Sequence, residues 1–130
     1  MFEHGGLAYI YFVYGRNWCL NVTTESVGTP AAVLIRAIEP ISGLSFMLQK
    51  RGHRDTRMLT NGPGKLAAAL DINGTLNGVD LTRVGPLYIA DSSIETANQI
   101  VSGPRIGVNV GRHLPWRFYL RENPFVSKTV

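Results

Sequence analysis

The chain has 130 residues, of which 45% are hydrophobic, so it is long and apolar enough to form one globular domain with a modest core. Thirteen Lys and Arg residues against nine Asp and Glu give a net charge of +4, which suits an anionic partner such as nucleic acid without requiring one. No window approaches the ~18 consecutive apolar residues of a membrane-spanning helix, and the first residues lack a signal-peptide pattern, so no membrane partner is expected.

A single cysteine, Cys19, cannot form a disulfide within the chain, which indicates a reducing compartment such as bacterial cytoplasm or a eukaryotic nucleus. Because Cys19 lies in an apolar run, we expect a small, buried core residue. His4, His53 and His113 have no ligand spacing between them, and one cysteine makes no zinc motif. We therefore expect no metal site.

The first half of the chain contains three runs with the composition of β-strands. Residues 7–13 and 18–23 are rich in β-branched and aromatic side chains, and the short link Tyr14-Gly15-Arg16-Asn17 between them predicts a β-hairpin. Residues 31–38 are nearly all apolar, so we expect a strand that is buried on both faces and ended by Pro40.

Two helices and further strands are expected after Pro40. Residues 41–50 have apolar side chains at helical spacing, and Asn61-Gly62-Pro63 is typical of a helix start. Turns are expected at residues 73–74 and 77–78, and strands at 85–90, 105–110 and 116–120, whereas 93–101 fits either a helix or a strand. More sheet than helix and no βαβ repeat predict a single α+β domain over residues 1–130.

The predicted hairpin is rich in tyrosine. Tyr9 and Tyr11 share one side of a strand because side chains alternate, and Tyr14 lies at the tip beside Arg16 and Asn17. An aromatic residue at a basic tip has the shape of a wedge that unstacks DNA, and one on the strand face can stack on an extruded base. The alternative is that tyrosine is simply a good strand residue.

Two polar residues interrupt apolar strands. The amide of Asn21 needs partners if it is buried, and these are either the edge of a base or the backbone. Arg36 stands in the most apolar strand, where a buried guanidinium requires a carboxylate, a phosphate or water. Glu39, Glu3 or a carboxylate outside residues 1–130 could be the partner of Arg36. A structural ion pair is as compatible with the sequence as a catalytic role.

Two glycine-containing segments carry weaker signals. Gly62-Pro63-Gly64-Lys65 combines free N–H groups at a helix start with a lysine, which fits an anion site. The Walker spacing is absent, and taken alone the segment favours an ordinary helix start over an anion site. Gly107, in a predicted strand, indicates either a close backbone approach or a bulge.

Taken together, five segments resemble the alkyladenine (3-methyladenine) DNA glycosylases in order and approximate spacing, over nearly all of residues 1–127. The segments are YIYFVYGRNWCLNV, VLIRAIEP, NGPGKLAAALDIN, GPRIGVN and PWRFYLRENPFVS. The resemblance implies an α+β domain with a curved, mainly antiparallel sheet, flanking helices and a protruding β-hairpin that intercalates into DNA.

The resemblance also implies roles for individual residues. Tyr11 matches the aromatic residue that stacks on the flipped base, and Asn21 matches the amide that excludes guanine by clashing with its amino group. Arg36 matches the arginine that helps to hold the attacking water beside the catalytic glutamate. The matched DNA contacts are Tyr14, which fills the gap in the duplex, Arg16 and Asn17 at the hairpin tip, Gly64 and Lys65 at the helix start, and Gly107, Val108 and Asn109 in a loop.

One part of the family pattern has no match. The family's general base is a glutamate in a Glu-Ala-Tyr segment, followed by a histidine, upstream of the hairpin. Residues 1–130 contain no such segment, and Glu3 and His4 lie too close to the hairpin to match it. We therefore expect an N-terminally truncated chain whose own activity is absent or impaired.

The implied reaction is hydrolysis of the N-glycosidic bond of an alkylated or deaminated purine in double-stranded DNA. The resemblance implies a monofunctional, monomeric enzyme without a cofactor. Two alternatives remain open: a DNA-binding module without catalysis, and an RNA-binding or structural β-rich domain.

Overall fold

The fold is described from a computed structural model that covers residues 1–13, 15–52, 55–92 and 99–127. The chain divides into two compact units, Met1–Ala90 and Asp91–Val130, which are described separately. Both units contain antiparallel sheet and the first also contains helices, so the predicted α+β class is confirmed.

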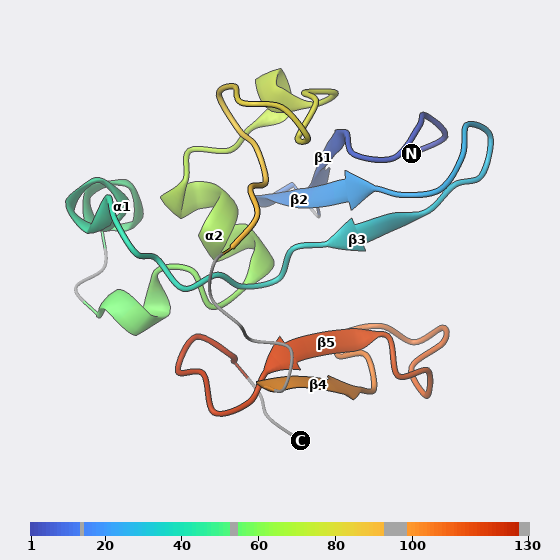
Figure 1. The fold of residues 1–130 in the computed structure, drawn as a ribbon. Coiled ribbons are helices and arrows are strands. Elements are labelled where there is room, and N and C mark those ends of the chain that lie inside the picture. The colour runs from blue at the N-terminus through green and yellow to red at the C-terminus, as the bar shows by residue number, and fades with distance from the viewer. Residues whose placement is uncertain (14, 53–54, 93–98, 128–130) are drawn as a thin grey trace. The chain divides into compact units, whose positions relative to one another are not determined.

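The first unit is built on a three-stranded antiparallel sheet (Figure 1). Its strands are β1 (Ala8–Val13), β2 (Asn17–Thr23) and β3 (Ala32–Leu34), in the order β1-β2-β3. Strands β1 and β2 pair along their whole length, from Ala8 opposite Val22 to Val13 opposite Asn17. The pairing of the two strands of the predicted hairpin is therefore confirmed, while its protrusion and its insertion into DNA stay predictions.

Strand β3 is shorter and more exposed than the sequence predicts, since a strand over residues 31–38 that is buried on both faces is expected. Only Ala32–Leu34 is a strand, and the side chain of Val33 is 55% exposed. The reason is its place in the sheet: β3 pairs with β2 on one side only, so its apolar residues line an edge of the sheet. Beyond Leu34 the chain still follows β2, since the Ile35 N–H donates to the Leu20 carbonyl at 3.0 Å.

Both predicted helices are present. Helix α1 (Leu44–Arg51) ends at Gly52, whose left-handed backbone (φ 60°) directs its N–H to the Leu48 carbonyl. Helix α2 (Pro63–Ala69) begins after Gly62 with Pro63 in its first turn, as the sequence predicts. Two short 3-10 helices, η1 (Thr56–Met58) and η2 (Gly74–Leu76), are each capped by the carboxylate or amide oxygen of the preceding residue, Asp55 or Asn73.

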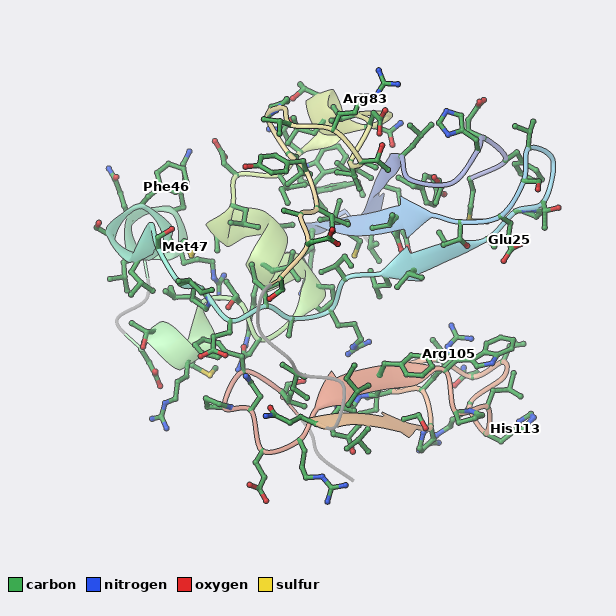
Figure 2. All side chains as sticks on the ribbon, in the orientation of Figure 1. Glu25, Phe46, Met47, Arg83, Arg105 and His113 are labelled. Atoms are coloured by element: carbon green, nitrogen blue, oxygen red, sulfur yellow. The ribbon has the colours of Figure 1, made fainter. Side chains whose placement is uncertain are left out.

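The main core lies between one face of the sheet and α2. Its buried members are Ala8, Ile10, Leu20, Leu66, Ala67, Ile72 and Leu81. A second cluster of Met47, Leu59 and Ala69 joins α1 to α2, and Figure 2 shows Met47 beside the exposed Phe46 on α1. Burial of these side chains at ~25 cal/mol per Å² of apolar surface is the main force that holds α2 on the sheet.

The outer edge of β1 is covered by residues 77–80, which follow η2. The Ala8 N–H donates to the Val79 carbonyl, the Gly78 N–H donates to the Ala8 carbonyl, and the Ile10 N–H donates to the Asn77 side-chain oxygen, each at 2.8 Å. The predicted turn at Asn77-Gly78 thus has a structural use, because it satisfies backbone groups that an edge strand would otherwise expose.

The predicted strand at residues 85–90 is wrong. This segment forms bends, and Tyr88 and Ile89 are exposed. The Ile89 N–H donates to the Leu81 carbonyl at 2.8 Å, and Pro86 has no N–H to contribute to a ladder. Residues 85–90 therefore have the composition of a strand but pair with no strand in the part of the chain that the structure describes.

The second unit contains a two-stranded antiparallel sheet of β4 (Ile100–Gly103) and β5 (Arg117–Leu120). The predicted strand at 116–120 is confirmed by β5. For the segment 93–101, which fitted either a helix or a strand, residues 93–98 lie outside the described residues, and residues 100 and 101 belong to β4. The predicted strand at 105–110 is wrong: Gly107 has a left-handed backbone (φ 75°), and the segment belongs to the loop between β4 and β5. Figure 2 labels Arg105 and His113 in this loop.

Candidate nucleic-acid interface

The three-stranded sheet has two chemically different faces. Ala8, Ile10 and Leu20 point toward α2 and form the core. Because side chains alternate along a strand, the residues between them point to the opposite face. We call this face the tyrosine face and define it by Tyr9, Tyr11, Cys19, Asn21 and Arg36.

Tyr9 and Tyr11 are neighbours on this face, as the sequence predicts. Their ring centroids are 5.3 Å apart and their planes are inclined by 35°. The side chain of Tyr11 is 40% exposed, and that of Tyr9 is half-buried. Tyr11 is therefore not sealed in the core and has a ring surface available for stacking.

Tyr11, Cys19 and Arg36 form a row across the sheet. Tyr11 lies opposite Cys19 in the β1–β2 register. The β2–β3 register places Asn21 opposite Leu34, and the bond from Ile35 to Leu20 continues it, which brings Arg36 opposite Cys19. The electrostatics agree: burial raises the pKa of the Cys19 thiol, and the Arg36 guanidinium opposes this rise.

Asn21 lies in the next row of the tyrosine face and is only 6% exposed. Its Nδ2 donates a hydrogen bond to the backbone carbonyl of Tyr9 at 3.0 Å. The backbone alternative for this amide is therefore realised. The bond uses one of the two N–H donors of the amide and fixes the direction in which the side chain points.

Arg36 differs from the expectation of a buried guanidinium. The residue is half-buried because β3 ends at Leu34 and the chain beyond it runs along the sheet edge. Arg36 and Glu39, one of the carboxylates considered as its partners, each make an interaction within the chain, and Glu39 and Glu3 are both exposed. A partly solvated arginine pays less desolvation and can contact water or a substrate from the edge of the sheet.

The hairpin tip carries the other predicted residues. Arg16 and Asn17 are exposed, and the Arg16 N–H donates to the Val13 carbonyl at 3.1 Å to close the turn at Gly15. Tyr14, the predicted wedge, lies outside the described residues.

The structure adds an aromatic pair behind the tip that sequence reasoning missed. The rings of Phe12 and Trp18, which are opposite each other in the register, are 4.9 Å apart, and Phe12 is 49% exposed. The ring of Trp18 also packs on Gly74 of η2, where an added Cβ would lie 2.9 Å from Cη2. Alternation along the paired strands puts both residues on the face away from the tyrosines. The contact of Trp18 with Gly74 joins residues that are distant in sequence.

The predicted phosphate-binding helix start adjoins the hairpin. Gly64 lies so close to Asn17 that an added Cβ would be 2.7 Å from the Asn17 Cγ. The Lys65 amine donates to the Asn61 side-chain oxygen at 2.8 Å. The structure therefore brings Asn17 against Gly64, the residue before Lys65. The space that glycine leaves at this position is occupied by a side chain of the chain itself.

Gly107, Val108 and Asn109 belong to the second unit. Gly107 and Asn109 are exposed and Val108 is half-buried. Both strand-based alternatives for Gly107 are wrong because the residue is in a loop, and its left-handed φ of 75° is the feature that requires glycine.

Among the described residues, no group of three or more His, Cys, Asp and Glu side chains is arranged to hold a metal ion. A search of the same residues found no helix with the length and apolarity needed to span a membrane.

The chain is similar in sequence to one protein family and to several relatives. The family described as Methylpurine-DNA glycosylase (MPG) matches residues 1–124. A relative in Carboxydothermus hydrogenoformans is 46% identical over 128 residues, which cover 98% of this chain and 67% of the relative. Relatives in Rhodopseudomonas palustris strain BisB18 and Salinibacter ruber are 47% and 45% identical over 128 and 127 residues; each alignment covers 98% of this chain but 62% and 61% of the relative, respectively.

The chain belongs to the methylpurine-DNA glycosylase family. The three relatives carry the name "Putative 3-methyladenine DNA glycosylase". The chain spans between 61% and 67% of the length of these relatives. The family resemblance on which the residue roles rest is thereby confirmed.

Proposed function

We propose that the chain serves base-excision repair as a DNA glycosylase domain that flips alkylated or deaminated purines and supports hydrolysis of their N-glycosidic bond. The observation that carries this proposal is the tyrosine face: in a member of this family, an exposed Tyr11 lies one row from a buried Asn21 and in the same row as Arg36. An aromatic surface beside an amide and a cation provides the contacts that a flipped purine needs.

Tyr11 and Asn21 are the proposed base-binding residues. The exposed ring of Tyr11 stacks on the flipped base, and alkylated purines that carry positive charge gain a further cation–π attraction. Asn21, held by the Tyr9 carbonyl, clashes with the exocyclic amino group of guanine and so excludes the normal base. Flipping costs a few kcal/mol and least for damaged or mispaired bases, which adds to selectivity.

The hairpin tip and two further segments are the proposed DNA contacts. Tyr14 fills the gap that the flipped base leaves, while Arg16 and Asn17 contact the opened duplex. Gly64 and Lys65 approach a phosphate, as do Gly107, Val108 and Asn109 in the second unit. The net charge of +4 favours these backbone contacts, whose strength falls as salt rises.

Arg36 is the proposed catalytic residue of this chain, because it helps to hold the water that attacks the anomeric carbon. The water gives up a proton as its oxygen bonds to that carbon and the bond to the purine nitrogen breaks. A neutral purine such as hypoxanthine takes up a proton as it leaves, whereas a positively charged alkylpurine leaves as the neutral base, so an abasic site remains in both cases. No lysine nucleophile is involved. Residues 1–130 contain no Glu-Ala-Tyr segment, so we expect the chain alone, as a monomer, to bind damaged DNA with little or no turnover.

The test compares binding to a duplex with a central hypoxanthine and to the matched undamaged duplex at one salt concentration. Tyr11→Ala should lower the preference for the damaged duplex by roughly 5- to 100-fold, since aromatic–base stacking contributes about 1–3 kcal/mol. Tyr88→Ala is the control, because Tyr88 is 48% exposed and lies outside the tyrosine face. An unchanged preference in Tyr11→Ala would contradict the proposal.

Two further measurements separate the alternatives. Robust release of hypoxanthine by the unaltered chain would show that the chain supplies its own base and would contradict the expected lack of turnover. Stronger competition by structured RNA than by abasic-site DNA would favour an RNA-binding domain.

A further inference from the structure

Tyr9 connects the two proposed base-binding residues. Its ring packs against the ring of Tyr11, with centroids 5.3 Å apart and planes inclined by 35°. Its backbone carbonyl accepts the hydrogen bond from Asn21 Nδ2 at 3.0 Å. Tyr9 thus contacts both residues, and it is itself more buried than Tyr11.

The ring contact restricts Tyr11. A partly exposed aromatic side chain on a strand can adopt more than one χ1 rotamer, and each lost rotamer on binding weakens a stacked complex. An aromatic pair at this separation is favourable beyond the area that it buries, so the Tyr9 ring holds the Tyr11 ring in one orientation before a base arrives. Stacking then requires less ordering of the side chain.

The carbonyl contact acts separately from the ring. Because Asn21 is bound by the backbone of Tyr9, replacement of the side chain leaves this hydrogen bond in place. A change of the Tyr9 ring should therefore weaken stacking by Tyr11 but leave the exclusion of guanine by Asn21 intact. A general loss of structure would weaken both.

We propose that Tyr9 is a positioning residue for base recognition, which presents the Tyr11 ring to a flipped purine. This role rests on the proposed function, since it requires that Tyr11 stacks on a base. It assigns to Tyr9 no contact with the purine and no part in the chemistry.

The test uses the full chain with Tyr9→Ile and Tyr9→Phe. Isoleucine keeps the strand preference and removes the ring, whereas phenylalanine keeps the ring and removes the hydroxyl. The first readout is the preference for a hypoxanthine duplex over the undamaged duplex. The second is the fluorescence of a duplex with 1,N6-ethenoadenine at the target position, an alkylated adenine without the 2-amino group that Asn21 excludes. Its emission rises when that base leaves the DNA stack and falls again when it stacks on a tyrosine ring.

Tyr9→Ile should lower the preference for hypoxanthine roughly 2- to 10-fold, the range expected for loss of an aromatic pair. It should leave the ethenoadenine brighter in the complex, while affinity for undamaged DNA and rejection of guanine stay unchanged. Tyr9→Phe should behave as the unaltered chain does, and Tyr88→Ile is the matched control.

Three results would overturn the proposal. Tyr9→Ile with full preference and unchanged fluorescence would show that the Tyr9 ring does not position Tyr11. Equal losses in Tyr9→Phe and Tyr9→Ile would assign the effect to the hydroxyl. An unaltered chain that does not distinguish damaged from undamaged DNA would overturn the proposed function itself, and that result is seen before any variant is made.

Discussion

At the scale of single residues, Cys19 is the buried titratable group on the tyrosine face. Its side chain is 8% exposed, and burial raises the pKa of the thiol while the Arg36 guanidinium opposes the rise. The folded chain therefore holds the thiol proton more tightly than the unfolded chain does. A raised pKa stabilises the folded state below the unfolded pKa, and this contribution is lost as pH rises through the folded pKa.

Cys19 should thus make stability depend on pH above roughly 8.5, the ordinary pKa of a cysteine. Urea unfolding at pH 7 to 10 should show a steeper fall in the free energy of unfolding for the unaltered chain than for Cys19→Ala. Tyrosine and lysine titrations are common to both proteins, so the difference between the two curves isolates the thiol. Parallel curves would contradict a raised pKa.

Sequence predicted some of these residues well and others poorly. Strand alternation placed Tyr9 and Tyr11 on one face, and an amide within an apolar strand marked Asn21. The burial of Arg36 was overestimated because composition does not distinguish a central strand from an edge strand. The Phe12–Trp18 pair was missed because aromatic residues in a strand give no signal of which of them meet.

At the scale of elements, the hairpin is fixed to the rest of the first unit by contacts that need glycine. Asn17 packs on Gly64 of α2, and Trp18 packs on Gly74 of η2. Both contacts lie near the tip, where a small rotation of the hairpin would move the tip residues relative to bound DNA. The short helices α2 and η2 therefore set the direction of the hairpin.

Gly74→Ala should destabilise the chain by about 1–3 kcal/mol, because the added Cβ would lie 2.9 Å from the Trp18 ring. In a Trp18→Leu background the same change should cost little, since the ring atoms that it meets are gone. Urea unfolding of the four proteins of this double-mutant cycle gives the coupling. Gly85→Ala is the control, because its Cβ would meet only the Arg83 carbonyl oxygen, at 3.9 Å. Equal costs in both backgrounds would refute the contact.

The sequence predicted an element correctly where a few neighbouring residues determine that element. The hairpin and the start of α2 follow from a glycine-containing turn and from proline in a first turn, and both are present. Residues 85–90 and 105–110 have the composition of strands but are not strands. A strand must pair with a neighbouring strand, and the sequence of one segment does not show whether such a neighbour exists. The same limit explains why β3 is shorter than its apolar run.

At the scale of the whole molecule, the tyrosine face lies within a single unit, Met1–Ala90. This unit contains the hairpin, the start of α2 and Arg36. The residues proposed to bind the flipped base therefore all belong to one compact unit. The division into two units was not predicted, because it depends on which strands pair across long sequence distances. The mixed α+β class was predicted because it requires only the type of each element.

The most direct test of base recognition is ¹⁹F NMR of the chain with 3-fluorotyrosine at its five tyrosines, assigned by single Tyr→Phe replacements. A saturating duplex with hypoxanthine should shift the resonances of Tyr11 and its neighbour Tyr9, whereas Tyr88 should stay in place. The undamaged duplex should leave Tyr11 nearly unshifted, since no base is held against it. A Tyr11 resonance that stays unmoved at saturation with damaged DNA would contradict the assignment of the tyrosine face as the base-binding surface.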